Sequence, residues 1–381
     1  MQDLYADIRP YQDDEVAVVL DRICRSETLH RALLKYRLGF LPHWLRELML
    51  PLARKLLERQ MADVQTVQQF QVWMGKWVEK LLAKTTTDVV VRGLDSMAPN
   101  QGHLWISNHR DIAMDPTLIN YSLHIAGWPT SRIAIGDNLL SHPDVADVMR
   151  LNKSFIVKRN ITNKREKLAA LQKLSNFIRF TLDEPGSVWI AQREGRAKNG
   201  IDQTDTAVLK MMALQGRERS EDFCASMTAL RPVPVCIQYE WDPCDVMKAR
   251  ELVARARYGS YSKEDGEDTR SLLTGITGHK GVVHVDFGRP LTAVEMESAD
   301  TMAAAIDQQI RDMTEILPVH NAALGLLQRE FGSHTELKAA MVSTELENRL
   351  LQRIEHEDRD VRRQVLMGYA MPILLQHGYT E

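Results

Sequence analysis

Residues 103–116 read HLWISNHRDIAMDP, and this stretch indicates how the chain folds. The apolar run at residues 103–107 is typical of a short buried strand. A polar segment follows it, and Asp115 and Pro116 then stand where a helix would begin, because aspartate caps helices and proline is tolerated in the first helical turn. The stretch therefore predicts a strand that leads through a short loop into a helix, the building unit of layered α/β sheets.

Strand-like and helix-like segments alternate on both sides of this unit. The strand-like runs are residues 88–92, 103–107, 132–135, 154–157, 187–190, 231–238 and 281–287. Residues 164–182 show a clear helical pattern between two of them. Its apolar residues recur at helical spacing and are expected to face inward: Leu168, Leu171, Leu174, Ile178 and Leu182. The alternation predicts an α/β fold, in which helices flank a mostly parallel central sheet.

Both ends of the chain are helical in pattern, which divides it into three parts. Residues 1–86 carry apolar side chains at helical spacing and predict an N-terminal helical domain packed as a bundle, in which Pro51 kinks or splits one helix. Residues 87–300 form the predicted α/β domain, and residues 301–381 a C-terminal helical extension. Within the middle part, the charged run at residues 260–270 predicts a mobile surface loop.

The composition excludes several classes of protein. The chain has 381 residues and a net charge of −3, so it lacks the overall basic field of a nucleic-acid-binding protein. Its four cysteines show neither CxxC spacing nor a histidine at ligand spacing, so we predict no metal site and idle thiols in a reducing cytosol. No run approaches the roughly 18 apolar residues of a membrane span, and the acidic N-terminus is unlike a secretory signal. We also find no GxSxG, P-loop, GxGxxG or HExxH motif, which argues against serine hydrolases, nucleotide enzymes and zinc hydrolases.

Residues 108–115, NHRDIAMD, contain the first candidates for chemistry. His109 follows a predicted strand, and strand ends in α/β sheets are where sites tend to be built. A histidine takes a proton from a hydroxyl most readily when a carboxylate orients its ring. Two carboxylates are available by position, Asp111 and Asp115, and the residues alone leave the choice open. The structural alternatives are a helix cap for Asp115 and a plain loop position for His109.

Residues 152–167 hold the second candidate, a cluster of cations. Lys158 and Arg159 follow a predicted apolar strand, Lys153 precedes it, and further basic residues come soon after. A local basic cluster in a chain of negative net charge suits a phosphate or carboxylate ligand. A solvated helix start is the alternative, and it explains the later cations better than it explains Lys158 and Arg159.

Residues 190–200, IAQREGRAKNG, contain the third candidate. Another predicted strand runs into Arg193, Glu194, Gly195 and Arg196, where glycine permits a tight turn. The two arginines could clamp an anion, and the glutamate could hold an arginine or a substrate hydroxyl. A charged loop without a function is the alternative.

The order of these segments resembles the glycerolipid acyltransferase superfamily, which includes glycerol-3-phosphate and lysophosphatidic acid acyltransferases. That family carries a histidine–aspartate motif, an apolar strand ending in basic residues, a Glu-Gly turn and a Val-Pro-containing strand. The matching residues here are Asn108-His109 with Asp115, Phe155-Ile156-Val157-Lys158-Arg159, Glu194-Gly195-Arg196 and Val233-Pro234-Val235. In one departure from the family, five residues rather than four separate His109 from Asp115.

The resemblance implies direct transfer of a fatty acyl chain, without an acyl-enzyme. His109 would be the general base, oriented by Asp115 as in the family, or by Asp111 if the longer loop carries Asp115 away. The residues that would bind the phosphate-bearing acceptor are Lys153, Lys158, Arg159, Arg193, Glu194, Gly195 and Arg196. The donor would be acyl-CoA or acyl carrier protein, with no further cofactor, and the acceptor glycerol-3-phosphate or a lysophospholipid such as lysophosphatidate, in phospholipid biosynthesis. A non-catalytic lipid- or phosphate-binding protein of the same fold is the alternative, which the longer spacing favours.

Residues 38–57 bear on where the protein acts. They are rich in leucine and contain Phe40, Trp44 and interspersed cations. Such a stripe could lie in a membrane interface or form the core of a helical bundle. We expect a cytoplasmic protein, and contact with the inner face of the membrane is the alternative to a free state.

Overall fold

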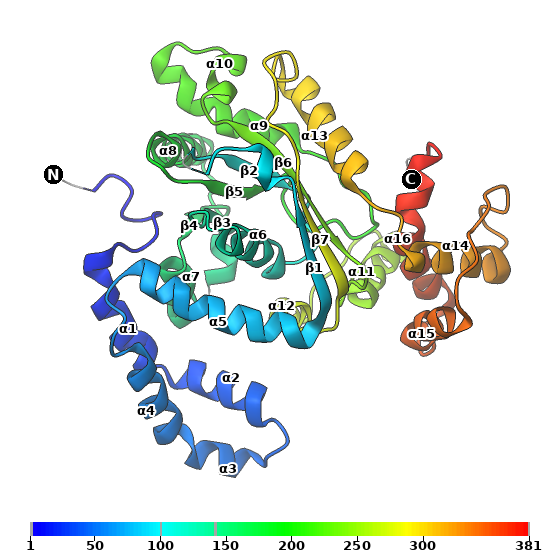
Figure 1. The fold of residues 1–381 in the computed structure, drawn as a ribbon, viewed down its shortest axis with the longest axis horizontal. Coiled ribbons are helices and arrows are strands. Elements are labelled where there is room, and N and C mark those ends of the chain that lie inside the picture. The colour runs from blue at the N-terminus through cyan, green and yellow to red at the C-terminus, as the bar shows by residue number, and fades with distance from the viewer. Residues whose placement is uncertain (1–2, 100, 141–142, 380–381) are drawn as a thin grey trace.

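The computed structural model describes residues 3–99, 101–140 and 143–379, and it confirms the α/β class (Figure 1). A seven-stranded sheet lies at the centre, with helices on both faces. Its strands are β1 (Thr86–Arg92), β2 (Leu104–Ser107), β3 (Arg132–Gly136), β4 (Ser154–Val157), β5 (Val188–Ala191), β6 (Pro232–Tyr239) and β7 (Gly281–Phe287). Each strand-like run of the sequence corresponds to one of these strands, with ends that differ by no more than two residues.

The strands are mostly parallel, as predicted. The order across the sheet is β1-β7-β6-β2-β5-β3-β4, and the five strands from β6 to β4 run parallel. Strand β7 pairs antiparallel with β6, and β1 pairs parallel with β7, so these two run the other way. Because the five parallel strands end on the same side, the loops that follow them meet along one edge, which we call the carboxyl edge.

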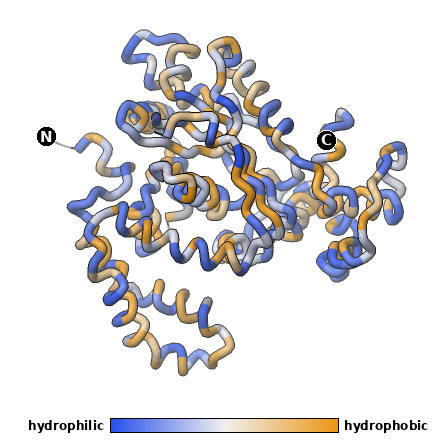
Figure 2. Tube along the Cα trace, viewed as in Figure 1, coloured by the Kyte–Doolittle hydropathy of each residue, from blue (hydrophilic) through white to orange (hydrophobic). Residues whose placement is uncertain are grey.

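The helices cover both faces of the sheet. They are α1 (Val16–Arg25), α2 (Glu27–Leu38), α3 (His43–Leu48), α4 (Leu50–Met61), α5 (Val67–Thr85), α6 (Met114–Ile125), α7 (Pro143–Leu151), α8 (Lys164–Asp183), α9 (Thr206–Met212), α10 (Phe223–Thr228), α11 (Asp245–Tyr258), α12 (Glu267–Thr277), α13 (Ala299–Met313), α14 (Pro318–Phe331), α15 (Thr344–Ile354) and α16 (Arg359–Gln376). Helices α8, α9, α10 and α13 share a core with Leu104 and Ile106 of β2, whereas α5 and α6 pack on Trp105. This division follows from the alternation of side chains along a strand. Figure 2 shows the resulting concentration of hydrophobic residues along the central strands.

The N-terminal helices have a core of their own. It joins α1, α4 and α5 to Leu151 of α7, so this part packs directly on the α/β layer. Helices α2, α3 and α4 form a hairpin that projects from the body of the protein (Figure 1). The prediction for Pro51 is confirmed, because α3 ends at Leu48 and Pro51 lies in the first turn of α4.

Two local predictions were wrong. Leu168 is 48% exposed rather than inward-facing, since burial along α8 begins only at Leu174 and the first half of the helix extends beyond the core. The charged run at residues 260–270 is not all loop, because α12 begins within it at Glu267. Helix α12 is anchored by small residues that sequence hydrophobicity does not reveal, Ser271 and Gly275, both of which are buried.

A separate core holds the C-terminal helices together. Helices α11, α14, α15 and α16 pack around it with Trp241, which follows β6. Helix α13 packs instead in the core on one face of the sheet, so residue 301 falls inside an element of the α/β layer. Within the described parts of the chain, no helix combines the length and the apolar character that crossing a bilayer requires.

Candidate active site

The loop after β2 is fixed to the sheet by Asn108. Its side-chain oxygen accepts a hydrogen bond from the Ile237 amide at 2.8 Å, and its side-chain nitrogen donates to the Ile237 carbonyl at 3.0 Å. These bonds continue the pairing of β2 with β6 beyond the last strand residue, Ser107. Asn108 is buried, so the next residue, His109, leaves the sheet from a rigid position at the carboxyl edge.

His109 is paired with Asp115. The His109 Nδ1 lies 2.8 Å from Asp115 Oδ2, and the carboxylate is fully buried. The same oxygen accepts the backbone amides of Arg110 at 2.7 Å and Asp111 at 2.9 Å, and Asp115 Oδ1 accepts the Tyr239 hydroxyl at 2.7 Å. The loop thus curls around the carboxylate, which explains how five intervening residues still allow the contact.

Burial and the neighbouring carboxylates keep Tyr239 protonated. Burial, followed by the charge of Asp115, raises its pKa well above the ordinary value, so the phenol stays a hydrogen-bond donor. Asp115 therefore accepts hydrogen bonds from two backbone amides and one phenol as well as facing the imidazole.

Asp111 has a different task. Its Oδ1 accepts the amides of Ala113 at 3.0 Å and Met114 at 2.8 Å, so it caps the start of α6. Burial and the charge of Asp115 raise its pKa. The choice left open by the sequence is thus answered by geometry, since Asp115 contacts the imidazole and Asp111 holds the helix.

The imidazole has one nitrogen left for a substrate. Nδ1 faces Asp115, and the edge of Trp189 lies against the ring with 6.1 Å between centroids. The His109 side chain is 15% exposed, so the ring is reachable from the carboxyl edge. A histidine fixed through Nδ1 can exchange a proton through Nε2.

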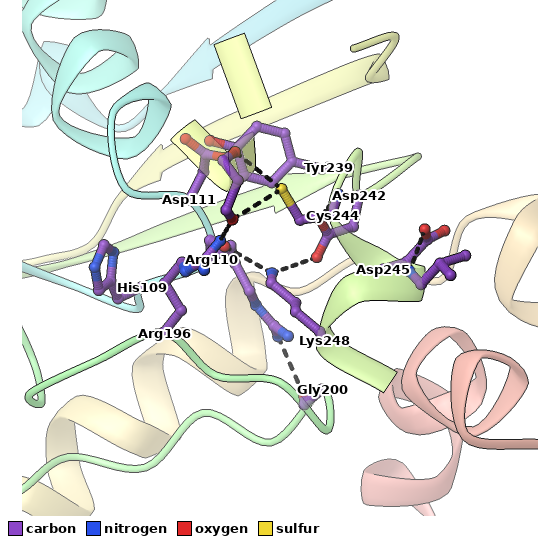
Figure 3. Close-up of polar contacts among 12 residues, drawn as sticks. His109, Arg110, Asp111, Arg196, Gly200, Tyr239, Asp242, Cys244, Asp245 and Lys248 are labelled. Atoms are coloured by element: carbon purple, nitrogen blue, oxygen red, sulfur yellow. Dashed lines mark hydrogen bonds and ion pairs between the residues drawn. The ribbon is translucent and has the colours of Figure 1, made fainter. Parts of the chain in front are cut away.

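The Glu-Gly turn lies directly beside His109. The Ala197 amide donates to the His109 carbonyl at 2.8 Å, and Gly195 adopts the left-handed conformation with φ of 79° that the turn requires. The Arg196 guanidinium donates to the Ser271 hydroxyl at 2.8 Å, and Figure 3 shows its side chain next to His109. Sequence positions far apart are therefore brought together as the motif order suggested.

Of the predicted cations after β4, the structure links Arg159 to this turn. Arg159 Nη1 lies 3.3 Å from Glu194 Oε1, and both side chains are partly exposed. Lys158 points elsewhere, because its ammonium pairs with Asp7 of the N-terminal segment at 2.5 Å. Arg193, in the same turn as Glu194, is half-buried.

The structure does not bring Lys153 to this edge. Lys153 precedes β4, and the start of a parallel strand lies on the opposite side of the sheet from its end. At that opposite edge the Lys153 ammonium donates to the Thr130 hydroxyl at 2.9 Å. Lys153 also lines a cavity of about 560 Å³ between α5 and α6. Burial, with the charge of Arg132, lowers the pKa of Lys153 to about 8.

Sequence reasoning missed several residues around His109. Tyr239 is the last residue of β6, and its hydroxyl bond to Asp115 depends on the register of that strand. Lys248 donates to the Arg110 carbonyl at 2.7 Å, and Asp202 accepts from the Arg110 side chain at 2.6 Å. Neither residue stands in a recognisable motif, so no local signal could have identified them.

A comparison with protein families agrees with the geometry. Residues 88–214 match the family model described as Acyltransferase. The chain therefore contains an acyltransferase domain. The matched segment of the acyltransferase contains His109, Asp115 and the Glu-Gly turn, and it ends before β6.

Other comparisons add little to this acyltransferase assignment. No curated protein matches the chain in sequence. Among solved structures, the 1-acyl-sn-glycerophosphate (LPA) acyltransferase PlsC from Thermotoga maritima is similar, with a TM-score of 0.39. The two are 14% identical, and the match covers 78% of this chain and 92% of that one.

Proposed function

We propose that this acyltransferase moves a fatty acyl chain from a thioester donor, acyl-CoA or acyl carrier protein, to a hydroxyl of a phosphate-bearing glycerolipid precursor. Glycerol-3-phosphate and lysophospholipids such as lysophosphatidate are the acceptors that we propose, in phospholipid biosynthesis. The observation that carries the proposal is the His109–Asp115 pair at the carboxyl edge, next to the turn that contains Arg196 and that Arg159 contacts through Glu194.

In this proposal His109 is the general base. Nε2 takes the proton of the acceptor hydroxyl while that oxygen attacks the thioester carbonyl, and Asp115 stabilises the imidazolium that forms. The tetrahedral intermediate then expels the thiolate, which takes the proton back from the ring. One ester forms, one thioester breaks and His109 returns to its starting state. Holding the two substrates in line would provide much of the remaining acceleration.

Arg196 is the cation best placed to bind the acceptor phosphate. Its guanidinium contacts the neutral hydroxyl of Ser271, which leaves its charge available to an anion. Arg159 pairs with Glu194, which lies in the same turn as Arg196. Glu194 could position Arg159 or the glycerol hydroxyl. Arginine suits phosphate because its planar fork forms two parallel hydrogen bonds.

We predict that Arg196→Ala raises the KM for the phosphate-bearing acceptor. A hydrogen bond to a charged group contributes roughly 1.5–3 kcal/mol, so the KM should rise by about tenfold or more. The KM for the thioester donor should change much less. Arg270→Ala is the matched control. Arg196 contacts Ser271 of α12, and Arg270 belongs to the same helix but is exposed and pairs with Glu264. An unchanged acceptor KM in Arg196→Ala would place the phosphate elsewhere.

The activity itself is tested by release of free thiol. Purified protein is incubated with acyl-CoA or acylated carrier protein and a panel of acceptors, and the lipid products are identified by mass spectrometry. We expect thiol release that depends on an acceptor with a hydroxyl near a phosphate. Binding of lipid without any thiol release would support the non-catalytic alternative instead.

We further propose that the projecting hairpin brings the protein to a membrane surface. Its large apolar side chains recur every four residues and are exposed: Phe40 (81%), Trp44 (64%), Leu48 (69%), Leu52 (53%) and Leu56 (47%). This spacing places Trp44 and Leu48 on one side of α3 and Leu52 and Leu56 on one side of α4, and Phe40 lies in the turn before α3. Leu52 and Leu56 also line an apolar groove of about 500 Å³ that the hairpin forms with α1, α5 and α7, so the hairpin residues do not form a closed bundle core. Cations interspersed along the hairpin favour an anionic lipid surface at the inner face of the membrane.

Vesicle flotation tests the membrane contact. The unmodified protein should float with vesicles that contain anionic lipid, and Phe40→Ser/Trp44→Ser/Leu48→Ser should remain at the bottom. These side chains are exposed, so the triple variant should keep its fold. Val294→Ser/Tyr258→Ser removes two equally exposed apolar side chains from other parts of the molecule and should float normally. If the unmodified protein does not float, the hairpin does not bind such membranes.

A further inference from the structure

A buried lysine, Lys248, binds the backbone of the loop that contains His109. Lys248 of α11 is almost fully buried, with 4% of its side chain exposed. Its ammonium donates to the Arg110 carbonyl at 2.7 Å and pairs with Asp242 (Figure 3). Burial alone would raise the pKa of Asp242, but the charge of Lys248 holds it below the ordinary value. Arg110 is the residue after His109, so this contact acts on the backbone next to the candidate base.

The C-terminal helices hold the other end of this ion pair. The turn after β6 contains Asp242, whose amide donates to the Tyr369 hydroxyl of α16 at 3.1 Å. Arg353 of α15 donates to the Asp242 carbonyl at 2.7 Å and pairs with Asp245, which also accepts the Tyr369 hydroxyl at 2.8 Å. The position of Asp242, and through it of Lys248, is therefore set by α15 and α16.

The Arg110 side chain is also held by groups near the C-terminal helices. Its Nη2 donates to Asp202 at 2.6 Å and to the Gly200 carbonyl at 3.1 Å. Gly200 packs tightly on α16, where an added Cβ would lie 2.7 Å from the Gly368 carbonyl. Both the carbonyl and the guanidinium of Arg110 are thus tied to groups that depend on the C-terminal helices.

We infer that Lys248 is a positioning residue for the acyl transfer, and that the C-terminal helices complete the active site by holding it in place. The family match ends at residue 214, so these helices lie outside the segment that carries the reactive pair. The inference rests on the proposed role of His109 as the base. Its physical reason is that a displacement of about 1 Å in a reacting group can reduce a rate by roughly 10²-fold.

The test begins with Lys248→Met, which keeps much of the side-chain volume and removes the ammonium. We expect kcat to fall by about 10- to 100-fold, since the Arg110 carbonyl loses its anchor. The KM values for donor and acceptor should stay within about twofold, because Lys248 touches neither substrate in the proposed arrangement. Arg250→Met is the matched control on the same helix. Arg250 also ties α11 to the C-terminal region, through Glu357, but has no contact with the His109 loop among the described residues.

A double variant separates positioning from stability. Lys248→Met leaves the partly buried carboxylate of Asp242 without its ammonium partner, which should lower Tm. Lys248→Met/Asp242→Asn removes that charge without restoring the bond to the Arg110 carbonyl. We expect Tm to recover substantially in the double variant while kcat stays low. Recovery of both Tm and kcat would show that Lys248 acts only through stability, and normal kcat in Lys248→Met would overturn the inference directly.

His109→Ala, measured in the same assay, separates this inference from the proposed function. If His109→Ala is active, the assignment of the base has failed, whatever the Lys248 variants do. If His109→Ala is inactive and Lys248→Met turns over normally, the base assignment stands and only the positioning role is lost.

Discussion

His109→Ala is expected to lower kcat by about 10²- to 10⁴-fold, the range typical for loss of a general base. The substitution removes the Nε2 that would take the acceptor proton, while the substrates keep their other contacts. The KM values should therefore change little by comparison. Thiol release under saturating donor and acceptor measures this directly.

The fold should survive this substitution. The His109 ring is partly exposed and, among the described residues, its side chain makes one hydrogen bond, to Asp115, which keeps three other donors. The far-ultraviolet circular dichroism spectrum should be unchanged. His356→Ala is a suitable control, because that ring is 89% exposed. Turnover of His109→Ala near the unmodified rate would show that another group takes the proton.

Asp115→Asn is expected to lower kcat by about 10²-fold or more, because the carboxylate charge that stabilises the imidazolium is lost. The amide is nearly the same size and can keep its oxygen toward His109 and the two backbone amides. Its nitrogen would then face Tyr239, whose hydroxyl can turn to accept. The loop should therefore keep its course while the electrostatic support disappears.

Asp111→Asn is the matched comparison for Asp115→Asn. Asp111 is a buried carboxylate four residues away, and an asparagine oxygen can still cap α6 through the amides of Ala113 and Met114. We expect Asp111→Asn to retain kcat within about tenfold. A larger loss in Asp111→Asn than in Asp115→Asn would exchange the roles of the two aspartates.

The fold could be predicted from the sequence because its signals are local. Short apolar runs between polar turns gave all seven strands, and helical spacing gave α8 and the N-terminal helices. The failures occurred where burial depends on distant partners. Leu168 matches the helical pattern but lies outside the core, and α12 is held by Ser271 and Gly275 rather than by large apolar residues.

The same division applies to the candidate site. Motif order identified His109 and Arg196, since both follow parallel strands that end at one edge. It misplaced Lys153, which immediately precedes β4. The start of β4 lies at the edge of the sheet opposite the carboxyl edge, so Lys153 lies there too. Lys248 gave no signal at all, because its contact with the Arg110 carbonyl joins residues 138 positions apart.

The pairing of Lys158 with Asp7 affects whether two copies of the protein can associate through the outer strand of the sheet. Strand β4 is the outermost strand, and the Ile156 amide donates outward to the Ile8 carbonyl of the N-terminal segment at 2.9 Å. Asp7 forms ion pairs with Lys158 and Lys173 and so holds that segment against the sheet. The two ammonium groups outweigh burial and lower the pKa of Asp7 to about 2. The fastening therefore persists until strongly acid conditions. A bare outer strand is a template for self-association, and here the segment that contains Asp7 and Ile8 lies along it.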